Sequence, residues 1–160
     1  MQIRKMLLSD YFNVYHLWLN TPGIGLNTKD DSEMGIEKYL RRNPNTCFVA
    51  EKEVEIIGVI LSGHDGRRGL IYHLAVKFSE REQGVGNTLL EHALEALRNE
   101  GIQKVYIMVF KNNEPETPFG KSEVFPFPMN LSIGQKRLFR LNILIYESKP
   151  PRLVVASQII

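Results

Sequence analysis

The hydrophobic and polar positions of the chain predict two helices near the N-terminus, preceded by a short edge strand at residues 3–6. A helix is expected after the capping pair Ser9–Asp10, with Phe12, Tyr15, His16 and Leu19 at helical spacing. A second helix is expected between a cap at residues 30–32 and a stop at Asn43–Pro44. Its apolar positions are Met34, Ile36, Tyr39 and Leu40.

Three strand-like runs come next, at residues 46–51, 56–62 and 70–78, and their short connections are typical of antiparallel hairpins. A strongly amphipathic helix then ends at Gly101, a favourable residue just beyond a helix C-terminus. Its predicted apolar face consists of Val85, Leu89, Leu90, Ala93, Leu94 and Leu97. The strand at 104–110 completes a right-handed strand–helix–strand unit with a parallel pair. The fold class expected is therefore α/β (α+β), with a mixed sheet flanked by helices.

The connection between the third of these runs and the amphipathic helix carries Arg81 and two glycines, Gly84 and Gly86. Glycines let a ligand approach the backbone closely, and the first turn of a helix offers unpaired N–H groups at the positive end of its dipole. This arrangement predicts a site for an anionic cofactor. Taken alone, the pattern also fits an ordinary turn or a dinucleotide fingerprint, but a Rossmann fold places its glycines after the first strand.

Composition narrows the function classes. The formal net charge of +2 is too small to favour nucleic acid or an anionic membrane surface as a partner. The single cysteine, Cys47, lies in an apolar run and is expected to be a packing residue, and no zinc-ligand spacing is present, so no metal is expected. Without an apolar signal segment or an 18-residue apolar run, a cytoplasmic protein is expected.

The segment Arg81-Glu-Gln-Gly84-Val-Gly86 resembles the acetyl-CoA signature of the GNAT superfamily of N-acyltransferases. The strand before it, and the strand after it with the following Asn113, are also similar to their family counterparts. The resemblance covers residues 1–114 and implies transfer of an acetyl group from acetyl-CoA to a small-molecule or peptide amine. It also implies that the fourth and fifth strands diverge around the thioester. The residues expected at the cofactor are Leu74, Ala75, Val76, Arg81, Glu82, Gln83, Gly84, Val85, Gly86, Asn87, Thr88 and Asn113.

In this family the amine attacks the thioester directly, so no covalent enzyme nucleophile is needed. The candidate catalytic residues are His73 and Tyr72, which strand periodicity places on opposite faces of the sheet. A histidine can accept the proton of an ammonium group near neutral pH. The alternative is that His73 is a packed core residue. Glu33 is a further candidate for the acceptor groove, with a solvated helix face as its alternative.

Residues 115–160 depart from the family, and the chain is therefore divided into a core at 1–114 and an atypical segment that completes or caps the same domain. Six of the eight prolines lie there, and only 138–146 is strand-like. Shifting the reading frame by one base lets residues 116–125 be read as Gly-Asn-Ala-Phe-Trp-Glu-Lys-Arg-Gly-Phe, which is similar to the missing family segment. We therefore hypothesise a single-base deletion or sequencing slip near the codon for Pro115.

This departure leaves two other functions open. One is a protein that binds CoA but is catalytically impaired. The other is an interaction module recognised through the Phe-Pro-Phe-Pro run at 125–128. Loss of the family's last strands would also expose the edge of the fifth strand and favour a homodimer. The runs at 141–146 and 152–155 are alternative partners for that edge.

Overall fold

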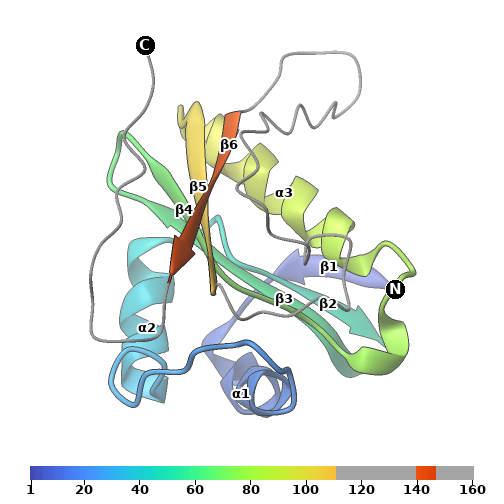
Figure 1. Ribbon diagram of the computed structural model, residues 1–160. Helices are drawn as coiled ribbons and strands as arrows, with labels where there is room; N and C mark the ends of the chain where they lie inside the picture. The colour runs from blue at the N-terminus through green and yellow to red at the C-terminus, as the bar shows by residue number, and fades with distance from the viewer. Residues whose placement is uncertain (111–139, 147–160) are drawn as a thin grey trace.

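The computed structural model describes residues 1–110 and 140–146 (Figure 1). Its helices and strands are β1 (Gln2–Lys5), α1 (Tyr11–Leu19), α2 (Glu33–Arg42), β2 (Phe48–Lys52), β3 (Glu55–His64), β4 (Gly69–Val76), α3 (Val85–Asn99), β5 (Lys104–Phe110) and β6 (Arg140–Tyr146). Short 3-10 turns precede α1, at Leu8–Asp10, and follow β4, at Phe78–Glu80. Within the described part of the chain, no helix is both long and apolar enough to cross a membrane.

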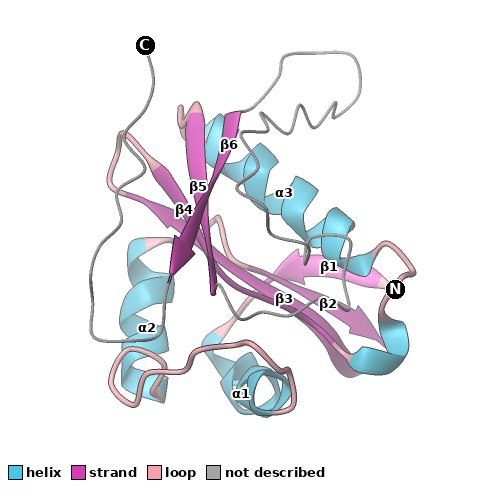
Figure 2. Cartoon of the chain, in the orientation of Figure 1, coloured by secondary structure: helices cyan, strands magenta, loops and turns pink. Residues whose placement is uncertain are grey.

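The strands form one mixed sheet in the order β1-β2-β3-β4-β5-β6. Neighbours from β1 to β4 are antiparallel, whereas β4 with β5 and β5 with β6 are parallel. Helix α3 covers one face of the sheet, and α1 and α2 cover the other (Figure 2). The mixed sheet with flanking helices confirms the expected fold class, and β1 lies at the predicted edge.

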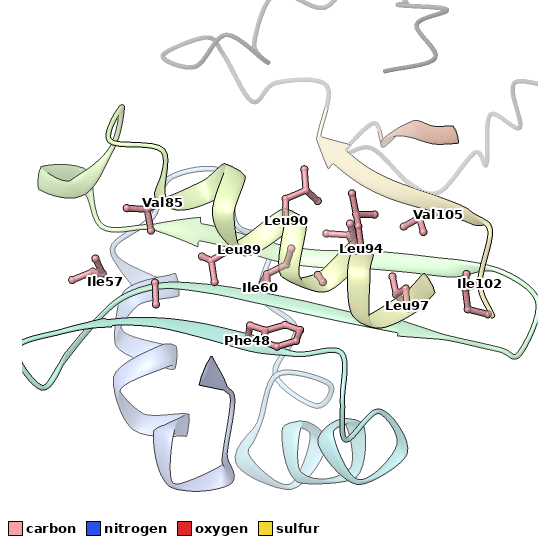
Figure 3. Close-up of a cluster of buried hydrophobic side chains, with 13 residues drawn as sticks. Phe48, Ile57, Ile60, Val85, Leu89, Leu90, Leu94, Leu97, Ile102 and Val105 are labelled. Carbon is pink, nitrogen blue, oxygen red and sulfur yellow. The ribbon is translucent and has the colours of Figure 1, made fainter. Parts of the chain in front are cut away.

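The core between α3 and the sheet follows the amphipathic pattern of the helix (Figure 3). Every residue of its predicted apolar face is buried, and Leu89, Leu94 and Leu97 have no exposed surface. Gly58 of β3 lets the helix come close, since a Cβ atom there would lie 2.9 Å from Cδ1 of Leu89. Gly101 ends the helix with φ of 81°, as expected of a residue just beyond the C-terminus.

Helix α1 is present as predicted, but it buries a different face from the predicted one. The buried residues are Val14, Leu17 and Trp18, whereas Phe12 is 69% and Leu19 58% exposed. In a helix of nine residues, the predicted set and the buried set of apolar residues both satisfy helical spacing. The set that contains the large Trp18 ring is the one that packs on the sheet. The cap is also different, because the Asp10 carboxylate accepts from the Leu7 amide at 2.8 Å and makes no cap bond to α1.

The cap of α2 is confirmed, since the Ser32 hydroxyl accepts a hydrogen bond from the Gly35 amide at 3.1 Å. In the C-terminal segment, the strand predicted at 138–146 is present as β6, which pairs in parallel with β5 along the whole length of both strands. The second run suggested for this edge, at 152–155, lies outside the described residues.

Candidate functional site

Strands β4 and β5 separate part-way along their length. They pair only where Gly69–Ile71 meets Val105–Ile107, although β4 continues to Val76 and β5 to Phe110. From Tyr72 onward, the side of β4 that faces β5 therefore has no strand partner among residues 1–110 and 140–146. This confirms the expected divergence of the two strands.

Alternation along β4 decides which backbone groups lie at this open edge. The amide of Lys77 donates to the Ile57 carbonyl of β3 at 2.8 Å. Because successive residues of an antiparallel strand turn their peptide groups to opposite sides, those of Leu74 and Val76 point away from β3. The intervening Ala75 pairs with Val59 and is buried. Of the three strand residues predicted at the cofactor, Leu74 and Val76 thus offer main-chain groups to the open edge.

A β-bulge interrupts β4 at His73 and Leu74. The register shifts between Val59 paired with Ala75 and Leu61 paired with Tyr72, so that two residues of β4 lie opposite one residue of β3. His73 has φ of 35°, in the left-handed region that residues with side chains rarely adopt.

The bulge changes where the two predicted catalytic side chains point. Tyr72 packs edge-on against Tyr39 of α2, with ring centroids 5.9 Å apart. His73 packs edge-on against Trp18 of α1, with centroids 5.0 Å apart. Both rings therefore lie on the α1–α2 side of the sheet, and the prediction that they occupy opposite faces is wrong. The extra residue at the bulge cancels the twofold alternation on which that prediction rested.

The glycine loop, at residues 81–86, connects β4 to the N-terminus of α3, whose first-turn amides are free of intrahelical partners. Gly84 precedes α3 with φ of 80°, and the amides of Val85, Gly86 and Asn87 belong to the first turn, where no intrahelical acceptor exists. A Cβ atom at Gly84 would meet nothing within 4 Å, and one at Gly86 would meet only Cγ2 of Val76 at 3.6 Å. The space above these amides is open, as an anion-binding site requires.

Arg81 holds a positive charge beside this helix end. Its Nε atom donates to the Val76 carbonyl at 3.2 Å, and its guanidinium lies 5.3 Å from the centre of the Phe78 ring. The side chains of Gln83 and Thr88 are bonded to main-chain carbonyls of the loop, and Glu82 is exposed. Of the residues predicted at the cofactor, the described ones lie along β4, the loop and the first turn of α3, whereas Asn113 lies outside the described residues.

Sequence reasoning missed the residue that binds His73. The Nε2 atom of His73 lies 2.7 Å from Oδ1 of Asp31, whose other oxygen accepts from the Asn27 amide at 2.6 Å. Asp31 is buried, and burial by itself raises the pKa of its carboxyl, but the hydrogen bonds from His73 and Asn27 outweigh it and lower the pKa below its ordinary value. The sequence marks Asp31 only as part of a helix cap, 42 residues from His73.

The other candidates are less well placed. Glu33 is exposed in the first turn of α2. Tyr72 is half-buried, and burial raises the pKa of its hydroxyl. Cys47 is buried and bonds to the Ser62 carbonyl at 3.3 Å, as expected of a packing residue. Within the described ranges, no group of three or more His, Cys, Asp or Glu side chains is arranged to hold a metal ion.

Comparison of the sequence with known proteins identifies a family. A model of the Acetyltransferase (GNAT) family matches residues 11–121. The chain belongs to the GNAT acetyltransferase family. It is 34% identical over 114 residues to an acetyltransferase of Pectobacterium atrosepticum, covering 71% of this chain and 79% of that protein. An acetyltransferase of Yersinia enterocolitica is 35% identical over the same number of residues and with the same coverage.

Solved structures of GNAT proteins share the fold at lower identity. Rv2747 from Mycobacterium tuberculosis, in complex with CoA, has a TM-score of 0.58 and 18% identity, with 68% of this chain and 64% of that chain covered. The ribosomal-protein-S18-alanine N-acetyltransferase of Escherichia coli has a TM-score of 0.55 and 18% identity, with coverage of 66% and 64%. GNAT enzymes use acyl-CoA.

Proposed function

We propose that this GNAT protein transfers the acetyl group of acetyl-CoA to a primary amine by direct attack. The observation that carries the proposal is the continuity of two binding features. The edge of β4 from Tyr72 to Val76, unpaired among the described residues, is joined by the loop at 77–83 to the open N-terminus of α3 at Gly84. A strand edge suits an extended amide-containing arm, and a helix N-terminus suits a pyrophosphate.

The chain's own groups divide the binding of acetyl-CoA between them. The first-turn amides of α3 would bind the pyrophosphate, with the Arg81 guanidinium beside it. Main-chain groups of Leu74 and Val76 would pair with the pantetheine arm as an added strand. The Arg81 side chain donates to the Val76 carbonyl, so its positive charge lies between the edge of β4 and the N-terminus of α3.

The chemistry needs a proton acceptor and a group that stabilises negative charge. The amine must first lose a proton, and its lone pair then attacks the thioester carbonyl while the carbon–sulfur bond breaks and CoA leaves as the thiolate. A backbone amide of β4 is suited to stabilise the developing oxyanion. His73, at the bulge and with 17% of its side chain exposed, is the proposed general base.

The proposed acceptor site lies on the α1–α2 side of β4. Tyr39 and Tyr72 are partly buried here, whereas Trp18 belongs to the core beneath them. The partly buried rings beside His73 would meet the apolar body of the amine while the imidazole meets its nitrogen. The substrate class proposed is a small-molecule or peptide amine.

The second candidate function is a protein that binds CoA without turnover. It is favoured by the departure of residues 115–160 from the family pattern, because the acceptor side of the cleft would be altered there. In that case the loop at 81–86 and the edge of β4 would still bind the cofactor.

Isothermal titration with acetyl-CoA, followed by a free-thiol release assay over a panel of amines, separates these functions. Binding with amine-dependent thiol release supports the transferase. Binding with no release across the panel supports the second function, and absence of binding contradicts both. The Arg81→Gln variant should bind acetyl-CoA more weakly, whereas Arg98→Gln, at the far end of α3, is the matched control and should bind it as the parent does.

A further inference from the structure

We infer that Asp31 positions His73 so that Nδ1 of the imidazole is the proton acceptor of the transfer reaction; the inference rests on the function proposed above. The two residues come from separate parts of the fold. Asp31 precedes α2, and His73 lies at the bulge of β4. Their contact joins the segment between α1 and α2 to the strand along which the cofactor is proposed to lie.

The position of Asp31 is determined by contacts on three sides. One carboxylate oxygen lies 2.7 Å from His73 Nε2, and the other accepts from the Asn27 amide at 2.6 Å. Its main-chain carbonyl accepts from the Tyr11 hydroxyl at 3.0 Å. With 8% of the side chain exposed, the carboxylate has little room to move, so it can hold the imidazole in one orientation.

The charge of Asp31 determines which nitrogen of the neutral ring carries the hydrogen. The lowered pKa of its carboxyl keeps the group ionised near neutral pH, and an ionised carboxylate can only accept hydrogen bonds. His73 Nε2 must therefore be the donor, which leaves the lone pair of the neutral ring on Nδ1. No hydrogen bond to Nδ1 is formed by any residue in the described ranges, so this lone pair has no protein partner there.

The surroundings favour a positive charge on the ring during the reaction. Trp18 packs against one edge of the imidazole, and Tyr72 precedes it in the strand. The ionisable groups that face the pair from α1 are Tyr11 and Tyr15, and burial raises the pKa of the Tyr11 hydroxyl, so it stays neutral. Glu33, in the first turn of α2, adds a negative charge on this side. The imidazolium would thus lie against the Asp31 carboxylate and neutral rings, with the Glu33 carboxylate as a second negative charge near Tyr11.

The proton path balances without any further reactant. The hydrogen leaves the ammonium nitrogen of the acceptor and bonds to Nδ1, and the freed lone pair forms the new carbon–nitrogen bond. The carboxylate of Asp31 stabilises the imidazolium until the proton passes to solvent or to the departing thiolate. Asp31 is a positioning residue in this scheme, since it acts through His73.

Nitrogen-15 NMR of the histidine rings tests the first half of the inference without requiring turnover. At a pH where the ring is neutral, the His73 signals, assigned by their loss in His73→Gln, should show hydrogen on Nε2 and none on Nδ1. In Asp31→Asn the Nδ1–H form should appear, because a side-chain amide can turn its NH2 group toward Nε2. Asp30→Asn removes an exposed neighbouring carboxylate and should leave the ring unchanged.

Kinetics test the second half. His73→Gln should lower kcat about 100-fold or more, the usual contribution of a general base. Asp31→Asn should lower kcat about tenfold with KM for the amine unchanged, because the imidazole is no longer held with its lone pair toward the substrate. Affinity for acetyl-CoA should be unchanged in both variants and in Asp30→Asn.

A ring with hydrogen on Nδ1 in the parent protein overturns the inference, as does an unchanged kcat in His73→Gln and Asp31→Asn. Failure of the proposed function looks different, because the parent then releases no thiol with any amine, whether or not it binds acetyl-CoA and whatever the ring signals show. Should His73→Gln not fold, Asp31→Asn decides by its tautomer and its kcat.

Discussion

Replacing Gly86 by alanine should make the protein more stable while weakening its hold on acetyl-CoA. Gly86 is the second residue of α3, and its φ is not in the left-handed region, so alanine can adopt its conformation. The added Cβ would meet only Cγ2 of Val76, at an ordinary contact distance of 3.6 Å. Nothing in the free protein therefore opposes the methyl group.

The two effects have opposite signs and separate origins. Glycine is less favourable than alanine within a helix by about 1 kcal/mol, so Gly86→Ala should raise the free energy of unfolding by up to about that amount. The same methyl group would lie beside Val76, where the edge of β4 and the start of α3 are proposed to hold acetyl-CoA. A tenfold or larger rise in Kd, about 1.4 kcal/mol or more, is expected for acetyl-CoA.

Urea unfolding and isothermal titration with acetyl-CoA measure both effects on the same samples. Glu91→Ala, at an exposed position one turn further along α3, is the matched control and should leave the Kd unchanged. An unchanged Kd in Gly86→Ala would refute the placement of the pyrophosphate at this helix end. A lower stability would show that the backbone at the start of α3 differs from the one described.

Three further predictions concern stability, reactivity and the C-terminal segment. Burial, the largest influence, raises the pKa of Asp10, but hydrogen bonds from Arg4 and the Leu7 amide outweigh it and lower the pKa below 3.8. The stability that this carboxylate contributes is thus fully present above about pH 4 and is lost as the pH falls through the lowered pKa. In thermal melts from pH 7 to pH 2, the melting temperature should fall less steeply in Asp10→Asn than in the parent. Burial raises the pKa of Cys47 to about 12, so a thiol reagent at pH 8 should modify it only on the timescale of unfolding, and fast labelling of the native protein would contradict its burial. Resequencing the gene should show codons at 116–125 that spell the family segment in the shifted frame, and an intact frame that cannot spell it would remove the frameshift hypothesis.

Sequence patterns predicted the fold well where one periodicity dominates. The face of α3 and its end at Gly101 follow from six apolar positions at helical spacing and one glycine. The strands β2, β3 and β4 follow from apolar runs between turns, and the divergence of β4 from β5 follows from the family resemblance. The buried face of α1 could not be predicted in this way, because two sets of apolar residues within nine positions have helical spacing and only tertiary packing determines which set is buried.

The candidate site divides in the same way. The proposed cofactor side consists of nearly consecutive residues, from the edge of β4 through Arg81 to Gly86, so a short motif indicates it. The proposed acceptor side depends on the contact between Asp31 and His73, and no local sequence pattern joins residues that far apart. The bulge that turns His73 toward α1 also escapes alternation, because a strand with an added residue has the same composition as a regular one.

The bulge in β4 also has a consequence for how such a site can change over generations. Because two residues of β4 lie opposite Ile60, deleting one of them would restore a regular ladder with the flanking pairs unchanged. Ile60 packs beneath α3, so the single residue left opposite it would face α3 as well. The strand could therefore lose one residue here and keep its core, but no side chain would then take the place of His73 beside Asp31.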